Sequence, residues 1–202
     1  MKIQGFMIAM FVLLAGSAEA EDYRSGFGFG ISVPDVWLVL TQDEVAKNAD
    51  LFLEDSETEF EAVPQKMRKV VYERVRSGQL EIFYRREGIS GSFVDNVNIM
   101  LQPAELPASS EQLQGVCLIL PGEFSRVFGR PIALDRCELR EFVNRPALYL
   151  QFDGAIPGTT TLQYQLQRTV GETVVLTATA ATANLPRMMG EFEEMVASIR
   201  LQ

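Results

Sequence analysis

The hydrophobic pattern of the chain predicts a series of β-strands. Apolar and polar residues alternate across 27–33 and 160–169, and this period of two is typical of half-buried strands. In 160–169 we expect Leu162, Tyr164 and Leu166 to face inward and the glutamines between them to face outward. Glycine-containing connections before 94–101 and 173–183 favour antiparallel hairpins. Further apolar runs predict strands at 37–40, 80–86, 94–101, 132–143, 148–152 and 173–183.

Three segments carry apolar residues at the spacing of an amphipathic helix, and they cover 64–78, 109–120 and 186–199. The serines that open the second segment are suitable N-caps. Pro121 is expected to end this helix, because proline inside a helix removes a backbone hydrogen bond. Strands segregated from helices predict an α+β fold with a single domain, in which a central antiparallel sheet is sandwiched by helices.

The first twenty residues have the pattern of a secretory signal peptide. Lys2 precedes ten consecutive apolar residues at 6–15, and Ala18 and Ala20 form an Ala-x-Ala cleavage site. Ten apolar residues are too few for a helix that spans a membrane, which requires roughly 20. We therefore predict cleavage after Ala20, a mature domain of residues 21–202, and a periplasmic or secreted location.

The composition excludes several kinds of chemistry. The 202 residues contain no His and two Cys, and 27 acidic against 18 basic residues give a net charge of −9. Without His, neither a Ser-His-Asp nor a Cys-His nucleophile system is available, and two Cys alone do not complete an ordinary structural zinc site. An acidic chain also disfavours nonspecific binding of nucleic acid. We expect no metal, no cofactor and no nucleic-acid partner.

The two cysteines, Cys117 and Cys137, are predicted to form a disulfide, because disulfides persist in the compartments that exported proteins enter. Two free buried thiols or a redox couple are the alternatives. The redox couple lacks the Cys-x-x-Cys spacing that is typical of such sites.

Basic residues gather in one part of this acidic chain. They lie on the helix predicted at 64–78 and at the end of the following strand. One interpretation is an ordinary solvated surface. The other is a docking face for an acidic protein partner or for an anionic lipid surface. The residues of this candidate face are Lys66, Arg68, Lys69, Arg74, Arg76, Arg85 and Arg86.

The segment Phe29-Gly30-Ile31-Ser32-Val33-Pro34-Asp35-Val36-Trp37 resembles the opening strand and turn, Gly-Phe-x-Ile-x-x-Pro-x-x-Trp, of the PsbP-like proteins. This group includes the extrinsic PsbP subunit of photosystem II and the Ran-binding Mog proteins. The order of the strands and helices is similar over most of 27–200, although Val36 stands where the family typically has glycine. The resemblance implies an α-β-α sandwich and a binding or assembly role rather than catalysis.

The sequence therefore favours an exported, non-catalytic accessory protein that docks a protein partner, and it leaves the oligomeric state open. One alternative is a carrier of a small apolar or lipid ligand, held between the sheet and a helix layer. The other is a His-free hydrolase that uses carboxylates such as Asp135, Glu138 and Glu141. The glycine run at 26–30 lacks the spacing of a phosphate loop, and the acidic stretch at 54–61 lacks the pattern of an EF-hand.

Overall fold

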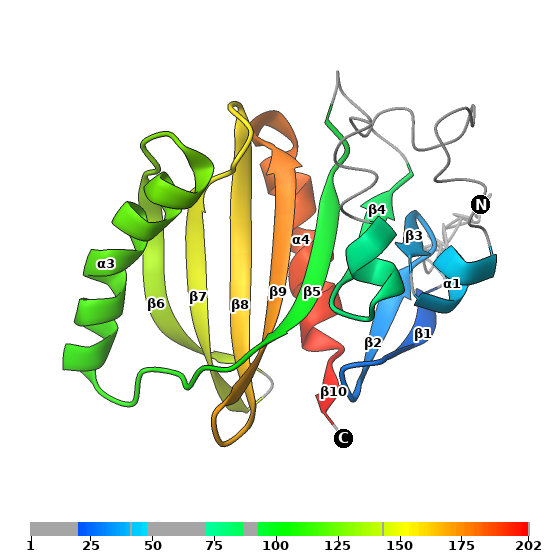
Figure 1. The fold of residues 1–202 in the computed structure, drawn as a ribbon, viewed down its shortest axis with the longest axis horizontal. Helices are drawn as coiled ribbons and strands as arrows, with labels where there is room; N and C mark the ends of the chain where they lie inside the picture. Colours follow the sequence, from blue (N-terminus) through cyan, green and yellow to red (C-terminus); the bar gives the residue numbers. More distant parts are fainter. Residues whose placement is uncertain (1–19, 41, 48–71, 87–92, 143, 202) are drawn as a thin grey trace, which may run out of the picture.

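The protein is described here by a computed structural model, which defines residues 20–40, 42–47, 72–86, 93–142 and 144–201. The β-structure of these residues consists of a seven-stranded sheet and a three-stranded sheet (Figure 1). Apart from Ala20, the predicted signal peptide lies outside the described residues, as does the acidic stretch at 54–61. Among the helices of the described part, none is both long enough and apolar enough to cross a membrane.

The large sheet confirms the predicted α+β fold with one antiparallel meander. Its strands are β3 (Trp37–Leu40), β4 (Glu81–Arg85), β5 (Asn96–Gln102), β6 (Leu134–Phe142), β7 (Arg145–Asp153), β8 (Thr159–Thr169) and β9 (Glu172–Ala181). Their order across the sheet is β3-β4-β5-β9-β8-β7-β6, and every neighbouring pair is antiparallel. The alternation in β8 is as predicted, because Leu162, Tyr164 and Leu166 lie in the main core.

The small sheet contains two strands that the sequence pattern did not predict. It consists of β1 (Ala20–Ser25), β2 (Phe29–Pro34) and β10 (Arg200–Leu201), with β2 in the centre. The segment of β1 is mostly polar and β10 is only two residues long, so neither shows a hydrophobic period. Gly28 closes the turn between β1 and β2 with a φ of 79°, a conformation that glycine adopts without strain.

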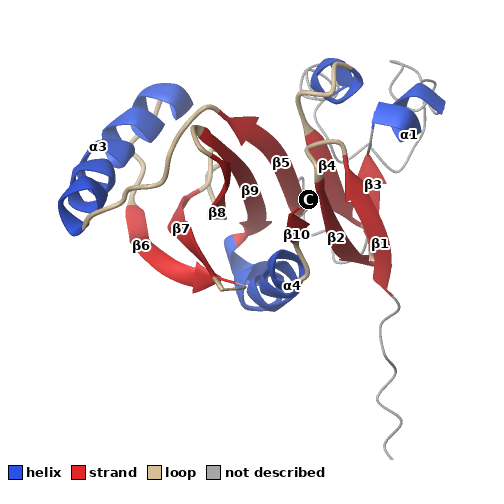
Figure 2. Ribbon diagram, turned by 90° about the horizontal axis from the view of Figure 1, so that it is seen from below, coloured by secondary structure: helices blue, strands red, loops and turns tan. Residues whose placement is uncertain are grey.

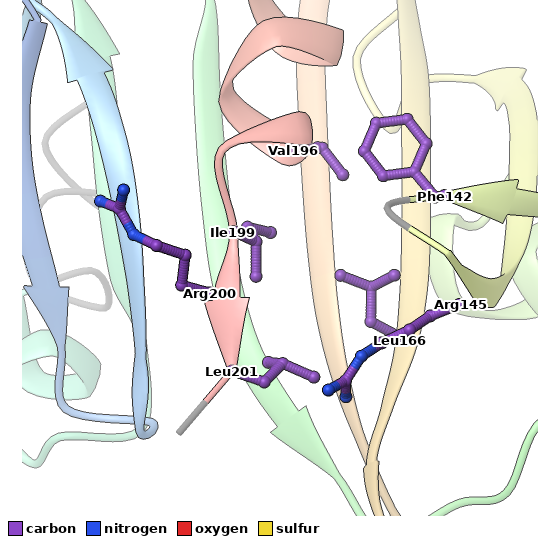
Figure 3. Close-up of a pocket in the computed structure, with 7 residues that line it drawn as sticks. All are labelled: Phe142, Arg145, Leu166, Val196, Ile199, Arg200 and Leu201. Atoms are coloured by element: carbon purple, nitrogen blue, oxygen red, sulfur yellow. The ribbon is translucent and has the colours of Figure 1, made fainter.

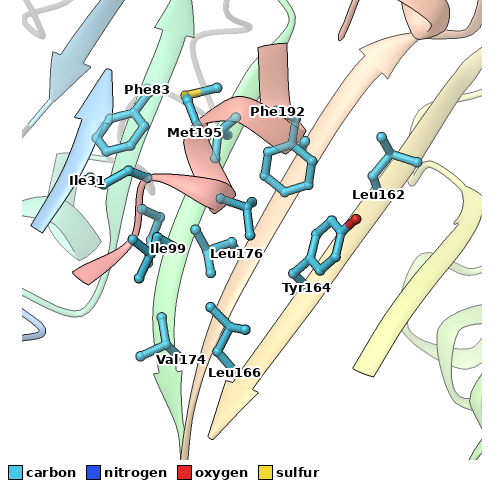
Figure 4. Packing of buried hydrophobic residues seen from close by; sticks show 14 of the residues in the cluster. Ile31, Phe83, Ile99, Leu162, Tyr164, Leu166, Val174, Leu176, Phe192 and Met195 are labelled. Carbon is cyan, nitrogen blue, oxygen red and sulfur yellow. The ribbon is translucent and has the colours of Figure 1, made fainter. Parts of the chain in front are cut away.

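Helix α4 (Leu185–Ala197) covers one face of the large sheet (Figures 2 and 4). It buries Met188, Phe192, Met195 and Val196 against strands β2, β8 and β9, as the predicted apolar face of 186–199 requires. Figure 4 shows Phe192 beside Tyr164 and Leu162, and the two aromatic rings lie 5.6 Å apart. Burial of these side chains stabilises the fold by about 2 kcal/mol each.

Helix α3 (Ser110–Phe128) lies over the β6–β7 end of the opposite face. Its N-cap is Ser109, one of the two predicted caps, and its side chain accepts a hydrogen bond from the Gln112 backbone. The prediction that Pro121 ends the helix was wrong, because the helix continues to Phe128. The same apolar spacing continues past the proline, and Phe124 stacks on Phe152 of β7 at 4.3 Å. Packing on the sheet thus outweighs the roughly 3 kcal/mol that an internal proline costs.

A smaller apolar cluster lies beyond β5 on the same face as α3. Helix α1 (Gln42–Lys47) contributes Val45 to it, and the helix at 72–76 contributes Val75. This second helix ends at Gly78, as predicted, with a φ of 69°. The sequence did not predict α1, because Val45 is the only buried side chain among those of α1 that the structure describes, and the segment shows no apolar period.

Candidate functional site

A pocket of about 240 Å³ opens where the end of α4 and β10 meet the turn between β6 and β7. Its floor consists of Leu166, Val196 and Ile199, which are buried, and its sides include Phe142 and Leu201, which are partly buried. Two arginines, Arg145 and Arg200, complete the lining (Figure 3). We call this site the Arg145 pocket.

The tight turn between β6 and β7 positions one side of the pocket. Only two residues connect these strands, and Asn144 has a φ of 60°, which suits this kind of turn. Phe142 and Arg145 flank the turn and pair with each other across the two strands. Their side chains consequently lie on the α4 side of the sheet, beside the buried Leu166 and Val196.

The two arginines of the pocket differ in their partners. Arg200 points away from the pocket toward the small sheet (Figure 3), and its guanidinium binds the Asp22 carboxylate at 2.7 Å. A hydrogen bond from Ser32, together with this ion pair, lowers the pKa of Asp22. Arg145 points toward Leu201, and no acidic side chain pairs with it in the part of the chain that the structure describes. Among the described residues, the pocket therefore joins an apolar floor to one positive charge that no acidic side chain compensates.

A second, more open pocket of about 300 Å³ lies on the other side of the same turn and shares Arg145. Its second arginine, Arg140, is already engaged. The Arg140 guanidinium lies 3.5 Å from the ring centre of Tyr149, donates a hydrogen bond to the Tyr164 hydroxyl, and binds Glu138 at 2.6 Å. Burial raises the pKa of both tyrosines, so neither is poised to ionise. This arrangement stabilises β6 on β7.

The structure divides the predicted basic docking face. Arg74 and Arg76 are exposed on the helix at 72–76, which precedes β4. Arg86 is exposed after the last residue of β4, and a strand of five residues is about 17 Å long. Lys66, Arg68 and Lys69 lie outside the described residues. The face therefore remains a prediction for the segment that includes these three.

Arg85 does not belong to this surface, so that part of the prediction was wrong. Its side chain is 8% exposed and binds Glu191 of α4 through two nitrogens, each at 3.0 Å. The Trp37 indole donates to the same carboxylate at 3.2 Å. Strand alternation explains the difference, because Arg85 points to the α4 side of the sheet whereas Tyr84 points to the other side.

The carboxylates considered for a hydrolase do not converge. Asp135 is exposed at an irregularity in the pairing of β6 with β7, Glu138 binds Arg140 on the α4 side, and Glu141 is exposed on the α3 side. Within the described ranges, no group of three or more Cys, Asp or Glu residues is arranged to hold a metal ion.

The predicted disulfide is present and joins the two layers on the α3 side. Cys117 of α3 is bonded to Cys137 of β6, and their Cα atoms lie 5.8 Å apart. Cys137 points to the same face as Leu150 and Leu148 of β7, so the bond closes over the apolar cluster that α3 covers.

No family model matches the sequence, and no curated protein matches it. Solved structures do match. Cyanobacterial PsbP (CyanoP) from Synechocystis sp. PCC 6803 is 10% identical, with a TM-score of 0.54 over 94% of this chain and 96% of that one. LpqN from Mycobacterium tuberculosis, described as involved in cell envelope biogenesis, is 13% identical, with a TM-score of 0.51 over 91% of each chain.

The Ran-binding protein Mog1p from Saccharomyces cerevisiae is 9% identical, with a TM-score of 0.50 over 92% of this chain and 96% of that one. The chain has the PsbP/Mog1-like fold. The fold confirms the resemblance carried by the segment from Phe29 to Trp37, which forms β2 and the start of β3. At this identity, the PsbP/Mog1-like fold transfers architecture and not function.

Sequence reasoning missed the Arg145 pocket. Its lining comes from β6, β7, β8, α4 and β10, which are separated by up to 59 positions and meet only after folding. The one local signal was the short break between the two apolar strands at 132–143 and 148–152, which places a polar turn with an arginine beside Phe142.

Proposed function

We propose that this protein is an exported, non-catalytic accessory protein that binds a protein partner through the Arg145 pocket. The observation that carries the proposal is the combination of an apolar floor with a guanidinium that lacks an acidic partner among the described residues. The partner segment that fits this chemistry has a large apolar side chain next to an Asp or Glu. The apolar side chain would fill the pocket, and the carboxylate would bind Arg145 in a charge-assisted hydrogen bond.

The size of the pocket favours one inserted side chain over a carried lipid. Pockets for small molecules usually enclose roughly 300–1,000 Å³. The Arg145 pocket, at about 240 Å³, is smaller and opens at the surface. Single buried anchor residues of this kind dominate the binding energy of many protein interfaces.

Export is supported by two separate features. The pattern of the first twenty residues is that of a signal peptide, and cleavage after Ala20 would leave β1 intact from Glu21 onward. The disulfide between Cys117 and Cys137 suits an oxidising compartment such as the periplasm. The description of Mog1p as a Ran-binding protein agrees with a binding role, and that of LpqN as involved in cell envelope biogenesis agrees with export. Both are analogies of fold alone.

Selection from a random peptide library on the immobilised mature protein tests the proposal. We expect enrichment of a large apolar residue beside Asp or Glu. The Arg145→Glu variant should exchange this preference for Lys or Arg beside the same apolar residue, because the charge at the mouth of the pocket is reversed. Identical selections by both proteins, or no enrichment at all, would contradict the proposal.

A second variant, Arg74→Glu with Arg76→Glu, tests the rival basic face. It should leave the selected peptides unchanged if the Arg145 pocket is the site. A loss of binding in this variant alone would move the site to the helix at 72–76. Mass spectrometry of the protein purified from its native envelope tests whether the protein is instead a lipid carrier. One bound lipid per chain would favour that alternative.

A further inference from the structure

The outer face of α3 exposes large apolar side chains that the fold itself does not use. Leu118 is 83% exposed and Ile119 is 61% exposed, at the centre of the helix. They point away from the sheet, because Leu113, Val116, Leu120 and the phenylalanines that follow form the inner face. The outer residues lie within an arc of about 100° around the helix. We call them the outer stripe, which consists of Glu111, Gly115, Leu118, Ile119, Gly122 and Arg126.

The outer stripe is symmetric about the midpoint between Leu118 and Ile119. Gly115 and Gly122 lie three positions before Leu118 and after Ile119, respectively. A charged residue lies seven positions away in each direction. The charges at the two ends are opposite, since one end carries Glu111 and the other carries Arg126. A Cβ added to either glycine would meet no atom within 4 Å, so both glycines leave the helix backbone open to a close neighbour.

We propose that α3 binds α3 of a second copy of this chain in an antiparallel pair, with a two-fold axis between Leu118 and Ile119. In this arrangement Leu118 lies opposite Ile119 of the second copy, and Gly115 lies opposite Gly122. Glu111 lies opposite Arg126, twice by symmetry. Such an interface uses the same patch on both chains and closes as a dimer. Small residues at the crossing let two helices approach closely.

The charges of the stripe favour a second copy over a membrane. An anionic lipid surface attracts clusters of Lys and Arg, whereas the outer stripe carries one charge of each sign. Its net charge of zero and its end-to-end charge opposition match its own antiparallel copy. Arg126 also binds Glu123 of its own helix, but both side chains are more than half exposed, and such surface pairs contribute little.

The place of α3 in the fold makes the stripe accessible and rigid. It lies at the end of the molecule away from β1, β2 and β3 (Figures 1 and 2). The disulfide holds the helix to β6 at Cys117, next to Leu118. A helix that is already ordered loses little conformational freedom on binding. One pair of helices is a small interface, so we expect a weak, concentration-dependent dimer.

Sedimentation equilibrium of the mature, disulfide-bonded protein over a series of concentrations tests the proposal. Glu111→Arg and Arg126→Glu each place like charges opposite one another, and each should weaken the dimer at least tenfold. An equimolar mixture of these two variants should associate again, because every facing pair in the mixed dimer is then complementary. Leu118→Gln should also weaken the dimer. Val127→Gln is the matched control, since Val127 is 66% exposed on the same helix but lies off the stripe.

Two results would overturn the inference. The first is a monomer at every concentration, or a dimer that Glu111→Arg and Leu118→Gln leave unchanged. The second is a loss of association in the single variants that mixing does not restore, which would exclude the antiparallel pairing. The helix content of each variant, measured by circular dichroism, separates a lost contact from a lost helix.

Discussion

Helices α3 and α4 cover opposite faces of one sheet, and they are attached to it in different ways (Figure 2). Helix α4 buries four apolar side chains completely and binds Arg85 through Glu191. Helix α3 is longer, yet none of its residues is fully buried, and a disulfide joins it to β6. Its outer face still exposes Leu118 and Ile119. The two helices therefore differ in how much of their apolar surface is buried against the sheet.

The sheet residues beneath the helices explain part of this difference. The α4 side presents leucine, valine, tyrosine and alanine across the central strands. In the middle of the α3 side the same strands present mostly threonine, glutamine and asparagine. The Thr and Gln side chains bind one another, as Gln163 does with Thr177 at 3.0 Å. These polar groups need no covering helix. Helix α3 is accordingly restricted to the β6–β7 end, where Leu148, Leu150 and Phe152 lie.

The largest effect should come from the charged contact of α4. Glu191→Ala leaves the buried guanidinium of Arg85 without its carboxylate, and removal of one partner from a buried pair lowers the free energy of unfolding by about 3–5 kcal/mol. Urea denaturation measures this loss. Glu194→Ala, an exposed position on the same helix, serves as the control and should change stability by less than about 0.5 kcal/mol. A similar small change in both variants would mean that apolar packing alone holds α4.

Loss of the disulfide should have the next largest effect and should act on α3. Replacement of Cys117 and Cys137 by Ser removes a link across a separation of 20 residues, which stabilises a fold by about 3 kcal/mol. Hydrogen exchange should then show faster exchange in α3 than in α4. Equal loss of protection in both helices would contradict the view that α3 is a separately attached layer.

The smallest effect concerns the dependence of stability on pH, which we expect to originate on the α4 side. Glu81 is buried there, and burial raises the pKa of its carboxyl, although hydrogen bonds from Ser25, the Gly26 backbone and Tyr23 partly oppose the rise. A raised pKa means that the folded state holds the proton more tightly than the unfolded state. The stabilisation is complete below the ordinary pKa of glutamate and is lost as the pH rises through the raised value.

Glu81→Gln removes this titration, so the variant should gain stability relative to the natural protein as the pH rises through the raised pKa of Glu81. Urea denaturation at several pH values measures the gain. Val170→Gln changes an exposed side chain without any titratable group, so it is the control and should give a constant difference from the natural protein at every pH. A constant difference for Glu81→Gln as well would contradict the prediction.

Periodicity was a reliable guide wherever one face of an element is buried. The bounds of β3, the inward residues of β8 and the buried face of α4 all follow from the sequence pattern. The pattern failed where long-range contacts decide the outcome. Strand β10 forms because β2 offers an unpaired edge, and α3 passes through Pro121 because the phenylalanines beyond it pack on β7.

The same reason limited prediction of the site. The cysteine pair was predictable, because only two cysteines exist and the predicted compartment oxidises them. The contact of Arg85 was not predictable. Arg85 and Arg86 are adjacent basic residues, and nothing in the sequence indicates that Arg85 binds a carboxylate 106 positions away while Arg86 is exposed. The Arg145 pocket likewise depends on the meeting of five elements.

The edge of the large sheet at β6 also bears on how the protein behaves in a crowded compartment. An edge strand offers unpaired backbone groups on which foreign strands can grow into aggregates. Strand β6 carries five charged residues between Asp135 and Glu141, and an irregularity near its start distorts the ladder. Both features discourage strand addition. The proposed pairing of α3 ends at a dimer, whereas addition of strands at β6 would continue without limit. The charges of β6 therefore leave the helix pairing possible and discourage aggregation through strands.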